Sequence, residues 1–385
     1  MALSKIDVAN MLTGVTPVAN GGTAATTLAG AGLKRPNAQS LIINGNMAVA
    51  QRGTSTTGVT SADYPACDRW NFAISSGGTW TVSQDTDVPS GEGFLTSMKY
   101  DCTTAESSLG SAAYLQHRQS IEGQNLQLLK KGTSNAEKLT VSFWVKATKT
   151  GTNVVRMYAY DDDRSCSIAY TISSSDTWEK KVMNFPADTT GVIDNDTGHG
   201  IQISWGLMAA SNFQSGTLAT SWAANSSAND FVGQVNHMDS TSNTWHITGV
   251  QLEVGEFSST TIPPYQHENL GDNLDRCKRY YQMIADSSDY FATGYYWTNS
   301  EATSKMQLEK EMRTQPTLDG VSGSNYFTFY ANNTADTIND FVVDASSSSR
   351  VVSFTDSGEA SGTAGMAGGW YRANASARFG LDAEL

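Results

Sequence analysis

Hydrophobic and polar residues alternate with a period of two through much of residues 40 to 265. Between residues 139 and 146 the odd positions hold Leu139, Val141, Phe143 and Val145, and the even positions hold Thr140, Ser142, Trp144 and Lys146. The same alternation returns in residues 168–172 and 201–207. A period of two places one row of side chains in a core and the other row outside. The pattern predicts antiparallel strands packed as a β-sandwich, with residues 37–265 as one domain.

The alternation changes phase in the last expected strand of this sandwich. Trp245 and Ile247 are odd, whereas Val250 and Leu252 are even. One extra residue in a strand produces such a slip, and glycine favours the backbone conformation that it requires. The sequence therefore predicts a β-bulge near Gly249.

A helical period follows in residues 268–284. Leu270, Leu274, Cys277, Tyr281 and Ile284 succeed one another at steps of four and three, which is the spacing of one helix face. Two prolines precede this segment and mark a break. We therefore expect a linker helix in residues 266–286.

The two ends of the chain differ from this middle part. Residues 1–36 contain few large apolar side chains, so we expect an extended segment that becomes ordered only against other chains. Residues 287–385 show short apolar and aromatic runs, which predict a small C-terminal β domain. The Gly-rich stretch 361–372 predicts a loop.

Composition and charge narrow the function classes. The net charge of −13 disfavours nucleic-acid binding, which requires a basic face. No apolar run reaches membrane-spanning length, and residues 1–14 lack the plan of a signal peptide. The four cysteines are scattered without a CxxC pair. They predict reduced, buried thiols, as in a protein made in a bacterial cytoplasm.

Several strings resemble segments of bacteriophage tail fibres and other virion fibre proteins. They are GVTPVANGGT (14–23), LIINGNMAVAQRG (41–53), YPACDRW (64–70), residues 245–282, EMRTQPTL (311–318) and LDAEL (381–385). Ala24 departs from the first motif, where glycine is usual. The resemblance spans most of the chain.

The resemblance implies a mostly β homotrimer with an extended N-terminal attachment segment. A jelly-roll sandwich like that of carbohydrate-binding modules, a short linker helix and a small C-terminal β domain would follow. The implied function is a non-enzymatic tail fibre subunit in the virion that mediates host adsorption. Its partners would be sister chains, an adaptor, collar, nozzle or capsid protein, and a host-surface glycan or protein. A capsid fibre or decoration protein, and a free carbohydrate-binding module, are the alternatives.

Two sets of residues are candidates for binding. The virion-attachment candidates are Pro17, Asn20, Gly21 and Gly22. The receptor-contact candidates are the aromatic residues Tyr290, Tyr295, Tyr296, Trp297, Trp370 and Tyr371. An aromatic ring can stack on the apolar face of a sugar while nearby polar groups bind its hydroxyls. The alternative is that these rings fill a small core or a trimer interface.

No pattern of residues predicts catalysis or a cofactor. GxSxG, Walker A and dinucleotide-binding motifs are absent from the sequence, and so is the solenoid repeat typical of spikes that cleave polysaccharides. The acidic strings YDDDRS (160–165) and DNDTGHG (194–200) could supply oxygen ligands to a structural calcium ion. They lack the complete calcium-loop pattern, so solvated turns are the other interpretation.

Overall fold

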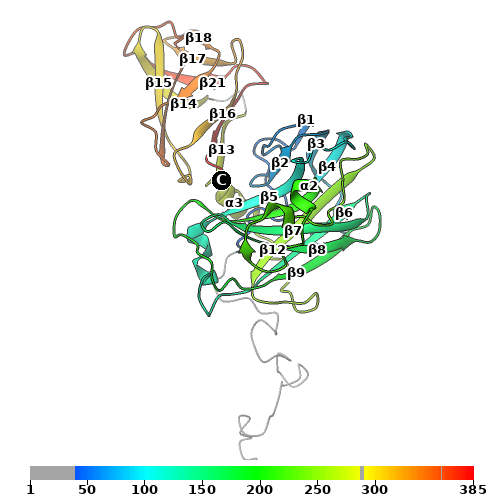
Figure 1. The fold of residues 1–385 in the computed structure, drawn as a ribbon. Helices are drawn as coiled ribbons and strands as arrows, with labels where there is room; N and C mark the ends of the chain where they lie inside the picture. The colour runs from blue at the N-terminus through cyan, green and yellow to red at the C-terminus, as the bar shows by residue number, and fades with distance from the viewer. Residues whose placement is uncertain (1–39, 287–289, 357) are drawn as a thin grey trace, which may run out of the picture.

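The computed structural model describes residues 40–286, 290–356 and 358–385, and it shows two β units in that part of the chain (Figure 1). The larger unit is a sandwich of two six-stranded sheets. The smaller unit combines a three-stranded and a seven-stranded sheet. Among the described residues, no helix is both long and apolar enough to span a membrane. The predicted mostly β architecture with a sandwich is confirmed.

The first sheet of the sandwich has the order β1-β3-β4-β12-β6-β9. Its strands in that order are Ser55–Val59, Thr79–Asp85, Ser97–Thr104, Thr244–Val254, Leu139–Ala147 and Glu179–Phe185. The second sheet has the order β11-β8-β7-β10-β5-β2. Its strands are Ala223–Ala224, Arg164–Ile172, Gly151–Ala159, His199–Ala209, Tyr114–Glu122 and Asn71–Ser75. Three short helical segments join these strands: η2 (Gly123–Leu129), α2 (Ser211–Gln214) and η3 (Ser227–Asn229).

The facing sides of the two sheets enclose one hydrophobic core. The inward row of β6 from Leu139 to Val145 is buried as the alternation predicted. The opposite row is not fully exposed, because Thr140 and Ser142 are also buried. Residues 255–267 cross this outer face, and Thr140 donates a hydrogen bond of 2.8 Å to the carbonyl of Gly255. The outer face of the first sheet is therefore partly roofed by a loop.

The predicted bulge is confirmed at Gly249. The register between β12 and β6 shifts between Thr248 and Gln251, and Gly249 has a φ of +63°. A Cβ atom there would lie 2.5 Å from the ring of Phe94. Glycine is required at this position both by the left-handed backbone and by the close approach of that ring.

The linker helix is much shorter than its apolar spacing predicted. Helix α3 comprises Leu270–Cys277 and is capped by Asn269, whose side chain accepts hydrogen bonds from two backbone amides. Tyr281 belongs instead to β13 (Tyr281–Ala285), which pairs with β22. A linker helix is therefore present, but the expectation that it extends over 266–286 is wrong. Pairing with a strand about 100 residues away, which local spacing does not reveal, decides the structure of residues 281–285.

The smaller unit packs a three-stranded sheet against one face of a seven-stranded sheet. The first has the order β13-β22-β16, in which β22 is Arg378–Asp382 and β16 is Thr317–Val321. The second has the order β18-β17-β21-β14-β15-β20-β19. Its strands are Thr334–Ile338, Phe327–Ala331, Ala367–Arg372, Tyr290–Thr298, Glu301–Gln307, Val351–Asp356 and Phe341–Val343. The prediction of a loop over 361–372 is wrong for its second half, because residues Ala367–Arg372 form strand β21.

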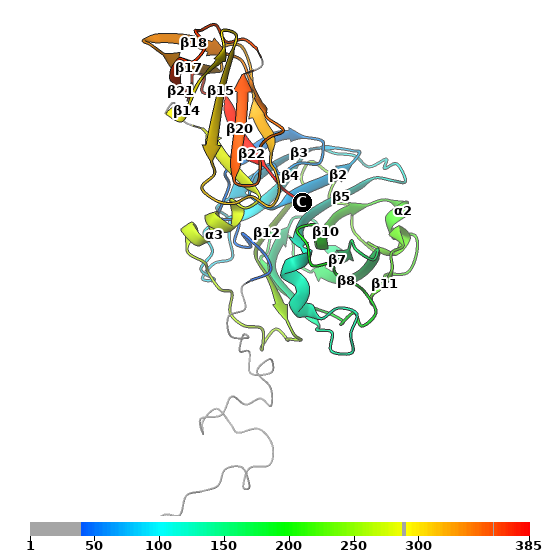
Figure 2. The ribbon, with the colours of Figure 1, turned by 90° about the vertical axis from the view of Figure 1, so that its left-hand side faces the viewer.

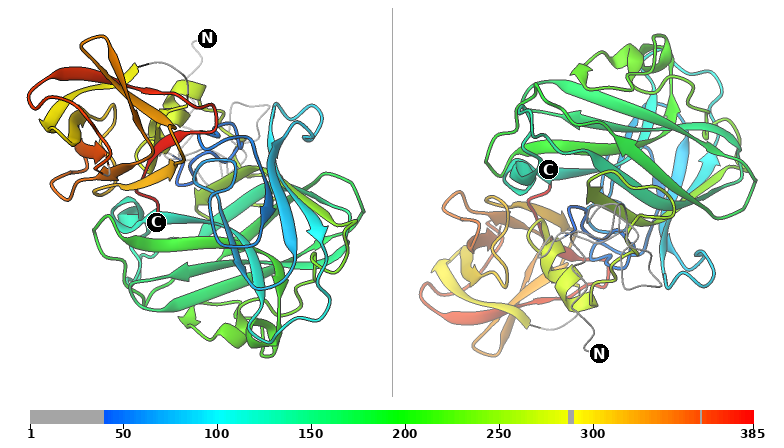
Figure 3. Two further views of the ribbon diagram at one scale, coloured as in Figure 1. Left: turned by 90° about the horizontal axis from the view of Figure 1, so that it is seen from above. Right: turned by 90° about the horizontal axis from the view of Figure 1, so that it is seen from below.

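The C-terminus lies between the two units (Figure 2). Charged side chains join the units there and at the end of β5. Glu122, at the end of β5, has a fully buried side chain. It accepts two hydrogen bonds of 2.7 Å from Arg279 and one of 2.5 Å from the hydroxyl of Tyr280. Arg52 of the sandwich pairs with Asp382 of β22 at 2.7 Å. Viewed from above or below, the two units stand largely beside each other (Figure 3).

A second buried arginine of the sandwich completes this junction. Arg69 is 1% exposed, pairs with Glu384 and lies 3.4 Å from the ring centroid of Tyr280. The hydroxyl of Tyr64 donates a hydrogen bond of 2.9 Å to the carbonyl of Leu385. The last residues of the chain are therefore fixed to the sandwich, and the seven-stranded sheet is attached through them.

Candidate functional site

Two of the predicted aromatic residues project from the outer face of β14. The side chains of Tyr295 and Trp297 are 41% and 63% exposed, and their ring centroids lie 6.3 Å apart. They share one face because successive side chains of a strand point to opposite sides. Tyr296, between them, points inward and is 4% exposed. Its ring packs on Phe329 at 4.9 Å, so the prediction that Tyr296 contacts a receptor is wrong.

A second pair of rings lies across β14 and β21. Tyr290 is 61% exposed and faces Tyr371 in register, with ring centroids 5.3 Å apart. A Cβ atom on Gly369 would lie 2.7 Å from the Tyr290 ring, so the absence of a side chain there makes room for the ring. Trp370 points the opposite way and is fully buried. Its Nε1 donates a hydrogen bond of 2.7 Å to Ser304, so Trp370 is a core residue and not a surface contact.

These four rings form a surface that we call the aromatic face: Tyr290, Tyr295, Trp297 and Tyr371. Thr303 lies opposite Tyr295 on β15, and Gly369 lies opposite Thr293. Rings that expose one side beside small polar residues suit a ligand with both apolar faces and hydroxyl groups, such as a sugar. Thr303 and Gly369 were not among the predicted residues. Their place on this face depends on strand pairing, which local sequence does not reveal.

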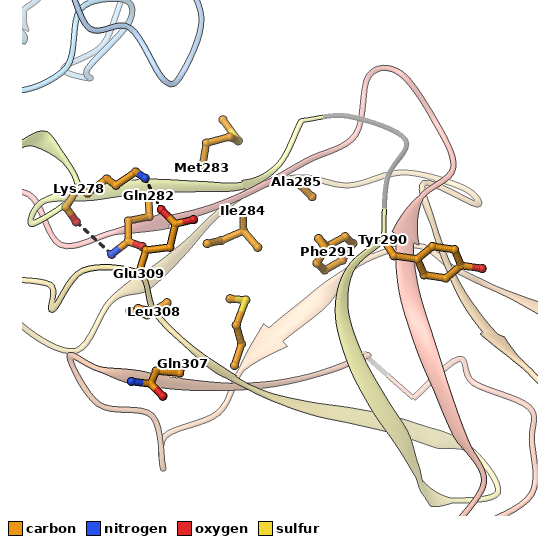
Figure 4. A pocket seen from close by; sticks show the side chains of 11 residues that line it. Lys278, Gln282, Met283, Ile284, Ala285, Tyr290, Phe291, Gln307, Leu308 and Glu309 are labelled. Atoms are coloured by element: carbon orange, nitrogen blue, oxygen red, sulfur yellow. Dashed lines mark hydrogen bonds and ion pairs between the residues drawn. The ribbon is translucent and has the colours of Figure 1, made fainter. Parts of the chain in front are cut away.

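A cavity of about 260 Å³ lies where β13 and Lys278, which follows α3, meet β14 and the end of β15 (Figure 4). The side chain of Gln282 donates hydrogen bonds to the carbonyls of Lys278, at 3.1 Å, and Lys310, at 2.7 Å. The ammonium of Lys278 pairs with the carboxylate of Glu309. These polar groups are already bonded to one another, and the remaining wall is mostly apolar. We interpret this cavity as a packing gap at the base of the small unit.

The two acidic strings do come together in the structure. The carboxylate of Asp161 accepts a hydrogen bond of 2.9 Å from the backbone amide of Asp194. Burial raises the pKa of Asp161; this hydrogen bond opposes the rise, and the nearby charges of Asp194 and Asp196 add to it. Asp162 is engaged by Lys131 at 2.6 Å. Among the described residues, no group of three or more such side chains is placed to hold a metal ion, and calcium stays a prediction.

The cysteines and most histidines serve the core in the described part of the chain. All four cysteines are free and buried, as predicted. His117 stacks on Trp70 with centroids 4.4 Å apart, and burial lowers the pKa of His117 to about 3. Burial likewise lowers the pKa of His237 to about 3. Neutral, buried imidazoles of this kind are structural.

The predicted virion-attachment residues are Pro17, Asn20, Gly21 and Gly22. They lie outside the described residues, and the assignment stays a prediction.

Comparison with solved structures gives low-identity likenesses to a phage tailspike domain and to carbohydrate-binding modules. The enzymatically active domain of bacteriophage CBA120 tailspike protein 4 matches at 14% identity and a TM-score of 0.27, over 56% of this chain and 21% of that one. The family 11 carbohydrate-binding module of a Clostridium thermocellum cellulase matches at 12% and 0.26, over 52% of this chain and 97% of the module. The xylan-binding CBM22-1 domain from Paenibacillus barcinonensis matches at 10% and 0.27, over 57% and 99%.

The chain therefore spans about a fifth of the length of the tailspike structure that it matches. No protein-family model matches the sequence, and no curated protein matches it. At these identities and TM-scores, the likenesses assign neither a function nor a ligand to this chain.

Proposed function

We propose that the chain is a non-enzymatic subunit of a bacteriophage tail fibre that binds glycans on the host surface through the aromatic face. The observation that carries the proposal is the exposure of Tyr295 and Trp297 side by side on β14. Large apolar side chains left in water on a rigid sheet are typical of a binding surface. The resemblance of residues 14–23, 41–53 and 245–282 to phage fibre segments supports the fibre assignment.

The proposed mechanism is multivalent stacking. The aromatic face offers rings at two places along β14, so one sugar chain can contact both pairs. Each contact is weak, because part of every ring is already buried against the sheet. In a homotrimer three such faces would act together, and avidity would exceed single-site affinity by about 10²–10⁴-fold. The proposal assigns no catalytic residue.

The binding step is tested with the full chain and a double variant, Tyr295→Ala with Trp297→Ala. Labelled protein is titrated against a panel of whole bacterial cells and cell-surface polysaccharides. We expect binding by the natural chain and a loss of about tenfold or more in the variant, since ~1.4 kcal/mol is tenfold in affinity. Val342→Ala, which truncates another exposed apolar side chain of the same unit, is the control and should bind normally. Equal binding by the double variant would exclude the aromatic face.

The assembly step has its own measurements. Light scattering after gel filtration should give three times the 41.3 kDa mass of one chain. Deletion of residues 1–36 should prevent incorporation into virions while both β units stay folded. A monomer in solution, or particles that incorporate the truncated chain, would contradict the fibre assignment. Imaging labelled protein on intact particles distinguishes a tail position from a capsid position.

A further inference from the structure

A groove of about 430 Å³ lies on the outer face of the sandwich. Its lining residues lie between positions 92 and 267, and so precede the aromatic face in the sequence. Its floor is the outer side of β9, β6 and β12, three neighbouring strands of the first sheet. Its walls are two loops, which cross the sheet at residues 92–94 and 259–267. The volume is in the range of small-molecule sites, about 300–1,000 Å³.

The floor carries one large ring in a polar row. Trp144 occupies an outward position of β6, between Ser142 and Lys146, and is only half-buried. In register it faces Thr248 on one side and Lys180 on the other. Among the described residues, the Trp144 ring has no aromatic partner and its indole nitrogen has no hydrogen bond. An indole held rigidly on a sheet with one side free is suited to stack on a ligand.

The walls add a cluster of three further rings. Phe94 lies 5.1 Å from both Tyr265 and His267, and the latter two are 4.9 Å apart, measured between ring centroids. Phe94 is buried, Tyr265 half-buried and His267 exposed. The bulge at Gly249 provides the space beneath the Phe94 ring. The wall is therefore fixed by the same glycine that shifts the register of β12.

Hydrogen-bonding groups without partners line the same groove. Lys180 and Glu92 both line the groove, and neither forms an ion pair among the described residues. The amide nitrogen of Gln251 is used by Glu253, at 2.9 Å, and by the carbonyl of Pro263, at 3.0 Å. Its carbonyl oxygen has no donor in the described part of the chain. The groove thus offers one cationic donor, one anionic acceptor and one amide acceptor near the Trp144 ring.

We propose that this groove is a second saccharide-binding site, which takes a neutral oligosaccharide. The combination of a free indole with separated donors and acceptors matches a pyranose, which has an apolar face and a rim of hydroxyl groups. Lys180 and Glu92 are exposed and line the groove, where they can donate to and accept from such hydroxyl groups. The opposite charges of these two residues cancel, so the groove does not select an anionic sugar. The site is independent of the aromatic face and goes beyond the proposed function.

The test uses the full chain and an array of neutral bacterial polysaccharides and oligosaccharides, with four variants. Trp144→Ala removes the floor, and Trp144→Phe keeps a ring there. Lys180→Ala removes the cationic donor. Trp297→Ala, on the small unit, is the matched tryptophan control. We expect at least one glycan whose binding falls about tenfold or more in Trp144→Ala, is largely kept in Trp144→Phe, and is unchanged in Trp297→Ala. Thermal unfolding of each variant shows whether the fold is intact.

The outcomes separate the two sites. If no glycan binds the natural chain, or if every bound glycan survives Trp144→Ala, the groove is not a saccharide site. Loss of binding in Trp297→Ala alone would support the aromatic face and overturn the groove. Loss in Trp144→Ala alone would do the reverse. If Trp144→Ala unfolds, Lys180→Ala decides, since its truncation leaves the sandwich core untouched, and unchanged binding then overturns the proposal.

Discussion

The most exposed tryptophan in the described part of the chain lies in the small unit. The sandwich buries Trp70, Trp80, Trp205 and Trp245 completely and leaves Trp144, Trp178 and Trp222 half-buried, whereas the small unit buries Trp370 and leaves Trp297 63% exposed. The sandwich has two large sheets, and each covers the inner side of the other. In the described part of the chain, β13, β22 and β16 cover one side of the seven-stranded sheet, and Tyr290, Tyr295 and Trp297 are exposed on the other. One strand of an open sheet therefore builds a core and an exposed aromatic surface at once, from alternate positions.

The outer surfaces of the two units also differ, because one is open and the other is partly covered by loops. The aromatic face is an open strand surface, whose rings rest on neighbouring strands. The groove on the sandwich is recessed, because two loops cross the outer side of the first sheet. The bulge at Gly249 makes room for Phe94, which belongs to one of these loops. An open face suits contact with an extended surface, and a recessed groove suits a single chain of sugars. Substitutions in each unit test how separate these roles are.

The largest expected effect contrasts two tryptophans of the small unit. Trp370→Ala should destabilise the protein by about 3–5 kcal/mol, because it leaves a large cavity in the core. Trp297→Ala should change the free energy of unfolding by no more than about 0.5 kcal/mol, as expected at an exposed position. Chemical denaturation of both variants measures this difference. Similar losses in the two variants would show that Trp297 packs against something, and the division between core and surface would fail.

The junction between the units gives the next largest effect. Glu122→Ala leaves Arg279 and the hydroxyl of Tyr280 without their shared acceptor, and we expect a loss of about 3 kcal/mol, as for other broken buried pairs. Calorimetry should then show the two units unfolding in separate steps. The control is Glu256→Ala, which breaks an exposed pair with Lys138 and should cost less than about 1 kcal/mol. A single transition at the natural temperature would mean that Glu122 does not join the units.

A smaller effect concerns the bulge that shapes the groove. Gly249→Ala combines a positive φ with a collision against the Phe94 ring, and we expect a loss of about 2–3 kcal/mol. Gly58→Ala is the matched control. Gly58 has a φ of +71° but open space around a Cβ atom, so only backbone strain of about 1 kcal/mol applies. Equal losses in urea denaturation would indicate that Phe94 moves aside freely and does not define the groove wall.

The smallest effect is a dependence of the junction on acid. Burial alone would raise the pKa of Glu122, but the hydrogen bonds from Arg279 and Tyr280 outweigh it and hold the pKa below its ordinary value. A lowered carboxylate pKa stabilises the fold above the unfolded value of about 4.3, and the stabilisation is lost as the pH falls through the folded value. Thermal unfolding between pH 7 and 3 should therefore show a steeper acid loss for the natural chain than for Glu122→Gln. Parallel curves would rule out this contribution.

Local sequence predicted the parts of the structure that depend on alternation. The inward row of β6 and the bulge at Gly249 follow from side-chain direction and from the freedom of glycine, which are local properties. The predicted helix was too long because residues 281–285 pair with β22 and form strand β13. The prediction that Tyr296 and Trp370 lie on the surface was wrong. The side of the sheet to which each ring points depends on the phase of its strand, and an aromatic cluster without clear alternation does not reveal that phase. Trp144 did stand in an outward row of the sequence pattern, and that position was the signal for the groove.

The contact between Arg69 and Glu384 joins positions 315 residues apart. During synthesis the ribosome releases the sandwich strands long before it reaches Glu384. Until then, the guanidinium of Arg69 lacks the carboxylate of Glu384 as its partner. Contacts at such separation form late, since a long loop must close first. Completion of the junction is therefore a late event in biogenesis, and a nascent chain that stalls before residue 384 would present an unpaired positive charge to the folding machinery of the cell.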